Sequence, residues 1–277
     1  MKQVPHCTQA MKSSIAVYNT IKQKVTFLYH KLKLNIHEKL KGRKPSITNQ
    51  DAISLSLFKQ KHTIATKKAL YDIADLDCTY KTLVVSMNRV AKLIGYLFAY
   101  LLNLERRDAH IVKHTDATDI PVCINKNARS HKTMHGLAAW GYSGKGHYYG
   151  LKLHLTSDLR RRILSIRFSP GNVHDTTMFL KLNKGLFGIF VADAAYTSQK
   201  LAEEFHIEHR RILFAKPRKN MHKLISKFQY HLYNTRMTVE WNFRDLKQFY
   251  GLVTSMPRSV NGYFVHYLST LLAYTVA

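Results

Sequence analysis

The stretch His110-Ile111-Val112-Lys113-His114-Thr115-Asp116 marks a change from helical to strand-like sequence. Its β-branched residues favour a strand, and the strand leads directly to an aspartate. Before this stretch, apolar residues recur at helical spacing; after it, the pattern indicates strands first and then alternating helices and strands. We therefore predict a small all-α domain over residues 1–108, followed over residues 109–277 by an α/β domain with a mixed sheet.

The predicted sheet starts as a meander, with Ser143-Gly144-Lys145-Gly146 as a hairpin turn. Strands are expected over residues 110–115, 134–142, 148–156, 162–168, 189–192 and 211–215. Helices are expected from about Asp175, which we interpret as an N-cap, over residues 198–205 and, after a basic loop, over residues 226–249 as one long helix. A further buried helix is expected over residues 263–277.

Residues 1–108 contain several short helical patterns with lysines between the apolar positions. Helices are expected over residues 14–41, 51–59 and 66–74, from about residue 79, and as a buried helix over residues 93–104. Short basic helices suit a DNA-binding domain, but a bundle that only packs against the catalytic part gives the same pattern. The longest apolar stretch, residues 93–104, is too short to cross a bilayer, so no membrane partner is expected.

The charge of the chain points to a polyanionic partner. There are 43 Lys+Arg against 17 Asp+Glu, a formal net charge of +26. Such an excess costs stability through self-repulsion, and nucleic acid is its natural counterpart. The excess is not a tail, because residues 1–108 carry 19 basic and 7 acidic side chains, which leaves +14 of the +26 for the rest. Both parts are therefore expected to face phosphate.

The cysteines argue against a disulfide scaffold or a zinc finger. Cys7, Cys78 and Cys123 are widely spaced and form no C-x-x-C pair. This favours a reducing compartment, and we expect a cytoplasmic protein.

Three carboxylates stand out in the acid-poor second half. Asp116 and Asp193 each follow a predicted strand, and strand ends are where α/β sheets meet their ligands, although either residue alone also suits a turn or cap. On a continuous helix, Tyr233, Arg236, Glu240 and Lys247 would share one face. A phenol, a guanidinium, a carboxylate and an ammonium together suit a phosphodiester site. The alternative for Glu240 is a solvent-exposed ion pair with a neighbouring arginine.

The spacing Tyr233-x2-Arg236-x3-Glu240-x6-Lys247 resembles the Y-(2)-R-(3)-E-(6)-K signature of DDE-class insertion-sequence transposases. Other segments resemble that family in the same order, from about residue 109 to the C-terminus. They are Asp116 with Ile120-Pro121-Val122-Cys123, Gly141-Tyr142-Ser143 with Tyr149-Gly150-Leu151-Lys152-Leu153-His154, Ser169-Pro170-Gly171-Asn172-Val173-His174-Asp175, Ala192-Asp193-Ala194-Ala195-Tyr196-Thr197-Ser198, and Lys216-Pro217-Arg218-Lys219-Asn220-Met221.

The resemblance implies an RNase H-like catalytic domain in which Asp116, Asp193 and Glu240 are the catalytic residues and metal ligands. Such carboxylates suit two Mg²⁺ (or Mn²⁺) ions per active site. The implied reaction cleaves transposon ends and joins the freed 3′-hydroxyl to target DNA. The implied partners are double-stranded DNA, as inverted-repeat ends and target, and a second copy in a homodimer on DNA; the implied location is the bacterial nucleoid. The residues expected to contact DNA are Tyr233, Arg236, Lys247, Lys216, Arg218 and Lys219.

The chain departs from the family pattern at two positions. Ala192 replaces the usual glycine before the second aspartate, and Asp119 stands where a neutral residue is expected. Two other functions use the same features: an RNase H-like nuclease that does not join strands, and a non-catalytic, domesticated DNA-binding protein. Three other features have open roles: Trp241 and Tyr196 suit either core packing or base stacking, and Arg160-Arg161-Arg162 suits either phosphate contact or a solvated turn.

Overall fold

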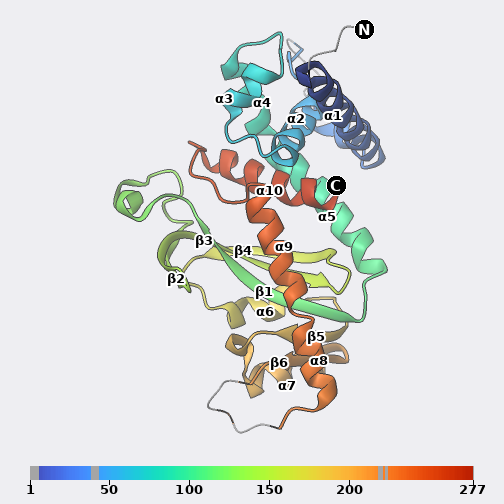
Figure 1. The fold of residues 1–277 in the computed structure, drawn as a ribbon, viewed down its shortest axis with the longest axis vertical. Helices are drawn as coiled ribbons and strands as arrows, with labels where there is room; N and C mark the ends of the chain where they lie inside the picture. Colours follow the sequence, from blue (N-terminus) through green and yellow to red (C-terminus); the bar gives the residue numbers. More distant parts are fainter. Residues whose placement is uncertain (1–5, 39–43, 218–220, 222–223, 277) are drawn as a thin grey trace. The chain divides into compact units, whose positions relative to one another are not determined.

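The computed structural model describes residues 6–38, 44–217, 221 and 224–276. The chain forms two compact units (Figure 1). Unit 1 comprises residues 1–100, 248–252 and 256–277, and unit 2 comprises residues 101–247 and 253–255.

Unit 1 is built from helices. They are α1 (His6–Lys31), η1 (Leu34–His37), α2 (Asn49–Lys61), α3 (Lys67–Ile73), α4 (Tyr80–Arg89), α5 (Ala91–Arg107) as far as Tyr100, and α10 (Val260–Thr275). Side-chain oxygens cap the starts of four of them, from Thr48, Thr66, Thr79 and Ser259. These caps satisfy backbone N–H groups that a helix leaves unpaired, which explains where the short helices begin.

Helix α10 belongs to unit 1, whereas the predicted boundary placed its residues in the second domain, residues 109–277. This C-terminal helix packs against α2 and α4 within unit 1. Its buried residues include Tyr263, Tyr267 and Leu271. Gln60 of α2 also donates hydrogen bonds to the Thr270 hydroxyl (2.8 Å) and to the His266 carbonyl (3.0 Å). The sequence pattern identified a buried helix here, but periodicity alone cannot tell which core buries it.

Unit 2 is a mixed α/β structure. Its strands are β1 (Val112–Pro121), β2 (Ala139–Ser143), β3 (Gly146–Asp158), β4 (Ile163–Pro170), β5 (Gly188–Ala192) and β6 (Arg211–Ala215). Its helices, besides the end of α5, are η2 (Asn125–Ser130), α6 (Asp175–Leu182), η3 (Ala194–Tyr196), α7 (Gln199–His209), α8 (Lys227–Asn234) and α9 (Met237–Gln248). The strand order is β2-β3-β1-β5-β6, and β4 pairs with β3. The pairings β1–β3, β2–β3 and β3–β4 are antiparallel, whereas β1–β5 and β5–β6 are parallel, so the predicted mixed sheet is confirmed.

Helices cover both faces of this sheet. His114 of β1 is hydrogen-bonded to Thr235 and Thr238 at the junction of α8 and α9, whereas Thr115 is hydrogen-bonded to Asn183 at the end of α6. Because consecutive strand residues point to opposite faces, α6 and the α8–α9 pair lie on opposite sides of β1. In Figure 1, α8 and α9 run across the sheet in front of β1 and β5.

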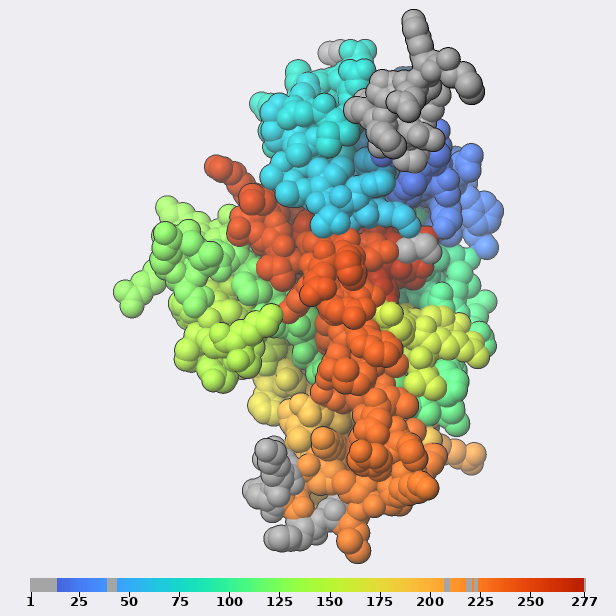
Figure 2. All heavy atoms as spheres, viewed as in Figure 1, coloured from blue at the N-terminus to red at the C-terminus, as the bar shows by residue number. Residues whose placement is uncertain are grey.

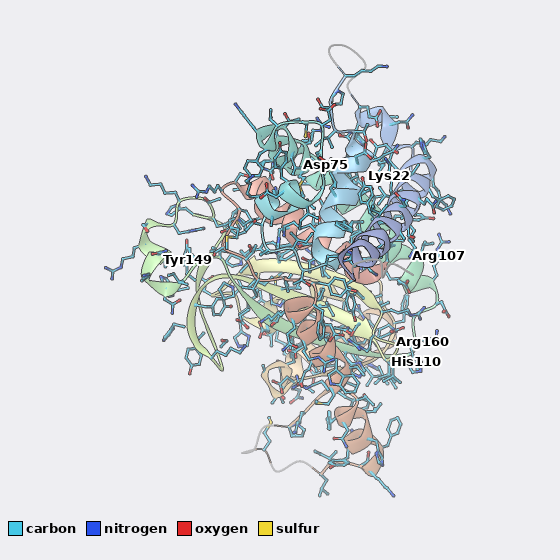
Figure 3. All side chains as sticks on the ribbon, turned by 45° about the horizontal axis from the view of Figure 1, so that its top comes forward. Lys22, Asp75, Arg107, His110, Tyr149 and Arg160 are labelled. Atoms are coloured by element: carbon cyan, nitrogen blue, oxygen red, sulfur yellow. The ribbon has the colours of Figure 1, made fainter. Side chains whose placement is uncertain are left out.

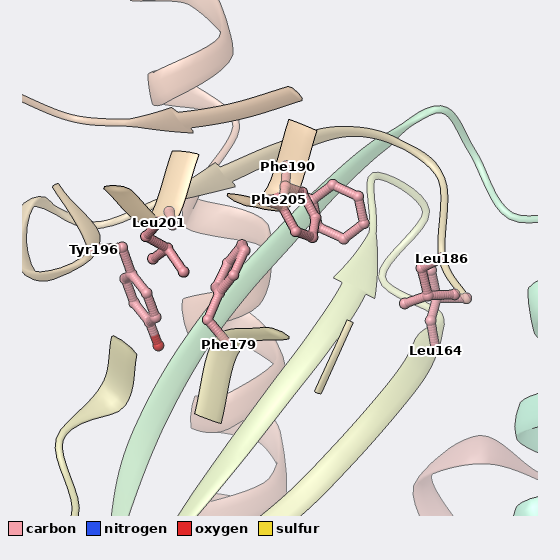
Figure 4. Packing of buried hydrophobic residues seen from close by; sticks show 8 residues of the cluster. Leu164, Phe179, Leu186, Phe190, Tyr196, Leu201 and Phe205 are labelled. Carbon is pink, nitrogen blue, oxygen red and sulfur yellow. The ribbon is translucent and has the colours of Figure 1, made fainter. Parts of the chain in front are cut away.

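An aromatic cluster fills the α6 side of the parallel half of the sheet. Figure 4 shows Phe179 of α6 between Tyr196 and the rings of Phe190 and Phe205. The ring of Phe179 lies 4.9 Å from that of Phe205 and 5.4 Å from that of Tyr196, centroid to centroid. Tyr196 is 1% exposed, so core packing is its role and base stacking is not.

A buried carboxylate at the end of β3, beside the start of β1, lies next to the arginine triplet. Asp158 is 0% exposed and accepts hydrogen bonds from the backbone N–H groups of His110 and Arg160. Figure 3 shows these two residues near each other. The guanidinium of Arg162 also lies 2.9 Å from Asp158, that of Arg160 pairs with Asp108, and that of Arg161 pairs with Asp245. All three guanidinium groups of the triplet therefore have acidic partners within the protein.

Three predicted elements differ from the structure. The helix expected over residues 14–41 ends at Lys31 and is followed by the short η1. Residues 134–137 form turns, and the strand begins only at Ala139. The long helix expected over residues 226–249 is interrupted between Asn234 and Met237, which gives α8 and α9. Among the described residues no single helix is long and apolar enough to span a membrane; one bent pair, α4 with α5, passes that criterion by length and composition.

Candidate active site

Asp116 and Asp193 lie next to each other on neighbouring strands. Parallel pairing of β1 with β5 ends at Thr115 opposite Ala192, and each aspartate is the next residue. Asp193 therefore follows a strand end as predicted. Asp116 does not, because β1 continues to Pro121 by pairing with β3 alone. The site lies where β5 stops and leaves one edge of β1 open, which is a typical place for ligands in α/β sheets.

Glu240 reaches the aspartates through Arg236. One guanidinium nitrogen of Arg236 lies 3.1 Å from Asp116 Oδ2, and the other donates to Glu240 Oε1. The side chains of Asp116 and Arg236 are 20% and 23% exposed, and that of Glu240 is 39% exposed. The pairing of Glu240 with Arg236 is the ion pair considered as its alternative role. Arg236 also contacts Asp116, so this ion pair is part of the acidic site.

His114 fixes the helix break that positions Arg236. Its imidazole is 0% exposed and lies 2.8 Å from the Thr235 hydroxyl and 2.9 Å from the Thr238 hydroxyl. Burial lowers the pKa of His114 to about 4, so the ring is neutral, with one nitrogen donating and the other accepting. His114 and Asp116 share one face of β1, so the same strand holds the α8–α9 junction and presents the carboxylate to Arg236.

The Asp116 carboxyl is electrostatically unusual. Burial raises its pKa to about 6, although the Arg236 guanidinium and the Ala117 backbone N–H act in the opposite direction. The neighbouring carboxylates of Asp193 and Asp175 raise the pKa further. Asp116 therefore sits in a concentration of negative charge that one arginine only partly neutralises, and such strongly perturbed carboxyls are typical of functional sites.

A surface pocket of about 360 Å³ opens beside these groups. It is lined by Asp193, Lys216, Tyr233, Asn234, Arg236, Met237 and Glu240. In Figure 2 the atoms of α8 and α9 (orange) form part of the visible surface. The exposed Lys216 has no ion pair with another described residue, so its ammonium is available to an anion. Tyr233 lines the pocket with its ring, but its hydroxyl proton is donated to the Ala215 carbonyl at 3.0 Å.

Lys247 lies outside this pocket lining and already has a partner. Its ammonium is 3.0 Å from Asp119 Oδ1, and the two side chains are 22% and 21% exposed. Because of the break at Thr235, the four residues Tyr233, Arg236, Glu240 and Lys247 do not share a continuous helix face. Tyr233 belongs to α8, Arg236 to the junction, and the other two to α9.

The remaining candidates divide into three groups. Asp175 does not cap α6, because the N-cap is His174 and makes no side-chain cap hydrogen bond. Asp175 instead pairs with Lys152 at 3.0 Å and influences Asp116 electrostatically, a role that the cap pattern concealed. Trp241 is 41% exposed and is therefore not a core residue; its ring faces the Arg161 guanidinium. Arg218 and Lys219 lie outside the described residues.

The donor chemistry at this site suits a hard divalent cation, but the arrangement is not a preformed cage. Carboxylate oxygens are the preferred ligands of Mg²⁺ and Mn²⁺. Within the described part of the chain, no three His, Cys, Asp or Glu side chains are grouped so that they could hold one ion. Arg236 explains this, because it donates to both Asp116 and Glu240. A cation bound by all three carboxylates would have to displace the guanidinium.

Residues 106–260, more than half of the chain, match the model of the transposase DDE domain family. The chain belongs to this family and is thus a DNA transposase, one of a class of metal-dependent enzymes that cleave and join DNA. No curated protein sequence matches it.

Two solved structures place the fold in context. The cryo-EM structure of the piggyBac transposase synaptic complex with hairpin DNA has a TM-score of 0.51 and 10% identity, and the match covers 95% of this chain and 74% of that one. This likeness concerns the fold alone and, with the family match, confirms the predicted RNase H-like α/β class. The crystal structure of the Mos1 mariner paired-end complex with Mn matches at a TM-score of 0.26 and 12% identity over 97% of this chain and 86% of that one.

Proposed function

We propose that this transposase cleaves insertion-sequence ends and joins the freed 3′-hydroxyl to target DNA, with Asp116, Asp193 and Glu240 as its catalytic carboxylates. The observation that carries the proposal is the register of β1 and β5, which brings Asp116 beside Asp193, together with the Arg236 bridge to Glu240. The spacing from Tyr233 to Lys247 supports the insertion-sequence assignment, because it equals the Y-R-E-K signature.

The three carboxylates are the proposed ligands of two Mg²⁺ or Mn²⁺ ions. Ions held there would activate the attacking oxygen and stabilise the leaving oxygen of an in-line phosphoryl transfer. The chain's own residues bind and orient the DNA. Lys216 lines the same pocket as Asp193, and its ammonium pairs with no described residue. The Arg236 guanidinium lines this pocket too and would become available to DNA once a cation displaced it from Asp116 and Glu240. Tyr233 orients the pocket wall through Ala215.

The remaining partners follow from this chemistry. Arg218, Lys219 and Lys247 are proposed to hold backbone phosphates next to the pocket, and the enzyme is proposed to act as a homodimer that brings two inverted-repeat ends together. Its proposed location is the bacterial cytoplasm, at the nucleoid, where its DNA substrates lie.

The decisive experiment compares wild type with Asp193→Asn on duplexes that carry the element's ends and on a target plasmid, with Mg²⁺ or Mn²⁺. We expect wild type to produce nicked ends and end–target joint molecules, and Asp193→Asn to bind the duplexes but produce neither. Nicked ends without joint molecules would favour a nuclease. Equal products from both proteins would refute the assigned site, and binding without any product from wild type would favour a DNA-binding protein.

Asp119→Asn is expected to tighten DNA binding, because it releases the Lys247 ammonium from its 3.0 Å ion pair. One additional phosphate contact should steepen the dependence of log K on log salt concentration by about 0.9. The measurement is a salt series of binding constants on one duplex. Asp72→Asn is the matched control, because it frees the exposed Lys68 in the same way but in unit 1. An unchanged slope for Asp119→Asn would show that Lys247 does not reach DNA.

A further inference from the structure

Two lysines of unit 1, Lys59 (buried) and Lys67 (partly buried), have no acidic partner among the described residues. Lys59 of α2 is 6% exposed, and its ammonium makes one hydrogen bond, to Gln60 Oε1 at 3.3 Å. Lys67, the first residue of α3, donates to Asn88 Oδ1. Neither forms an ion pair with any residue that the structure describes. Each ammonium has three N–H donors, so both keep unused donors.

Among the described residues, no acidic group offsets the charge of either lysine. His266 of α10 is close enough to both for their charges to lower its pKa, in addition to the larger effect of burial. Its Nε2 lies 2.7 Å from the Gly251 carbonyl oxygen, which only accepts, so Nε2 carries the proton and Nδ1 faces the Gln60 amide. The ring is therefore neutral and cannot act as a counter-ion.

The start of α10 adds further positive potential. Asn88, which accepts from Lys67, also reaches the hydroxyl of Ser259 at 3.5 Å, and Ser259 is the N-cap of this 16-residue helix. The helix dipole places partial positive charge at this end. Burial lowers the pKa of Lys59 and of Lys67 to about 8, and for Lys59 the charge of Lys67 contributes as well. Both therefore stay largely protonated at neutral pH, although buried charges in proteins are normally paired.

We propose that Lys59 and Lys67 form a seat for one backbone phosphate of bound DNA, with the N-terminus of α10 at its side. The phosphate is the missing counter-ion. The net charge of +12 on residues 1–108 favours DNA over a small anion, because a single phosphate neutralises little of it. The phosphate seat depends on the proposed function only because it takes DNA as the substrate. It gives the C-terminal helix, which packs within unit 1, a part in DNA binding.

The test is a salt series of DNA-binding constants for the full-length protein on a duplex of arbitrary sequence. Lys59→Met and Lys67→Met should each reduce the slope of log K against log salt by about 1, uniformly across sequences. Because both lysines hold the same phosphate, the double variant should lose about 1 as well, not 2. Lys61→Met, which removes an exposed lysine of the same helix, is the matched control with a smaller expected change.

Two further measurements separate a phosphate seat from a structural role and from a small-anion site. Without DNA, the methionine variants should unfold at the same temperature as wild type or higher, because they remove a charge that is buried at Lys59 and partly buried at Lys67. Inorganic phosphate, compared with chloride at equal ionic strength, should raise the unfolding temperature of wild type more than that of Lys59→Met.

Three outcomes would overturn the proposal. They are wild-type slopes in both seat variants, a Lys61→Met slope reduced as much as theirs, and stabilisation by inorganic phosphate with no change in the DNA slopes. A failure of the proposed function is recognised separately, because it appears as DNA cleavage retained by Asp193→Asn, whatever the slopes are.

Discussion

Asp116→Asn is expected to abolish DNA cleavage and, at the same time, to stabilise the folded protein. The loss of activity follows from removing a central carboxylate of the proposed site, and we expect a decrease of about 1,000-fold or more. The gain in stability follows from the cost of burying this group in its charged form. The pKa of Asp116 is about 6 in the folded protein, against 3.8 for an ordinary aspartate.

The sign of the stability change depends on pH. A carboxyl whose pKa is raised by folding binds its proton more tightly in the folded state, so its stabilising contribution is present below pH 3.8 and is lost as the pH rises through 6. Above that range, the ionised group costs up to about 3 kcal/mol. Asparagine avoids most of this cost, although it leaves Arg236 with Glu240 alone. We expect a gain of about 1–2 kcal/mol near pH 8 that disappears near pH 3.

Denaturant unfolding in the absence of metal and DNA measures this difference at both pH values. Asp245→Asn is a control of opposite sign. Burial raises the pKa of Asp245, but hydrogen bonds from Arg161 and Arg244 outweigh it and hold the pKa below its usual value. Its ionised form therefore stabilises the fold, and Asp245→Asn should reduce stability near pH 8. A stability loss in Asp116→Asn near pH 8 would show that the ionised Asp116 carboxyl does not destabilise the fold.

Local sequence patterns predicted the sheet well, for a physical reason. The hairpin turn lies between β2 and β3, where Gly146 has a φ of +105°, a conformation that L side chains rarely adopt. Such turn chemistry is readable from a few adjacent residues. The strand after the crossover also ends at Ala192 as predicted, so that Asp193 follows it.

Features that depend on distant residues were not predictable in this way. Sequence periodicity gave one helix over residues 226–249, whereas a buried histidine 121 positions before Thr235 holds the break that sets Arg236 against Asp116. The pairing of Lys247 with Asp119 spans 128 positions. Asp119 was noticed as an unexpected acid, but only the tertiary structure shows its partner. Ion pairs within the site therefore had to come from the structure, while the three proposed catalytic carboxylates were predicted from the sequence.

Arg236→Ala should destabilise the metal-free protein, and added metal should reverse much of that loss. Arg236 is the one cation that donates to both Asp116 and Glu240 among the described residues. Its removal leaves the carboxylates of Asp116 and Glu240 without their shared cation and raises the pKa of Asp116 further, because the guanidinium lowers it. Breaking a fully buried pair costs about 3–5 kcal/mol, and partial exposure at this site reduces the expected loss to about 2 kcal/mol.

Mg²⁺ or Mn²⁺ should stabilise Arg236→Ala more than wild type, because in wild type a cation has to compete with the guanidinium for the same oxygens. The difference in unfolding free energy between the two proteins should therefore shrink as the metal concentration rises. Arg244→Ala is the matched control: Arg244 lies on the same helix, is 51% exposed and pairs with Asp245, so its loss should be small and independent of metal. If the difference in unfolding free energy between wild type and Arg236→Ala does not change with metal, the cation does not bind where Arg236 now lies. The three carboxylates would then not form one metal site.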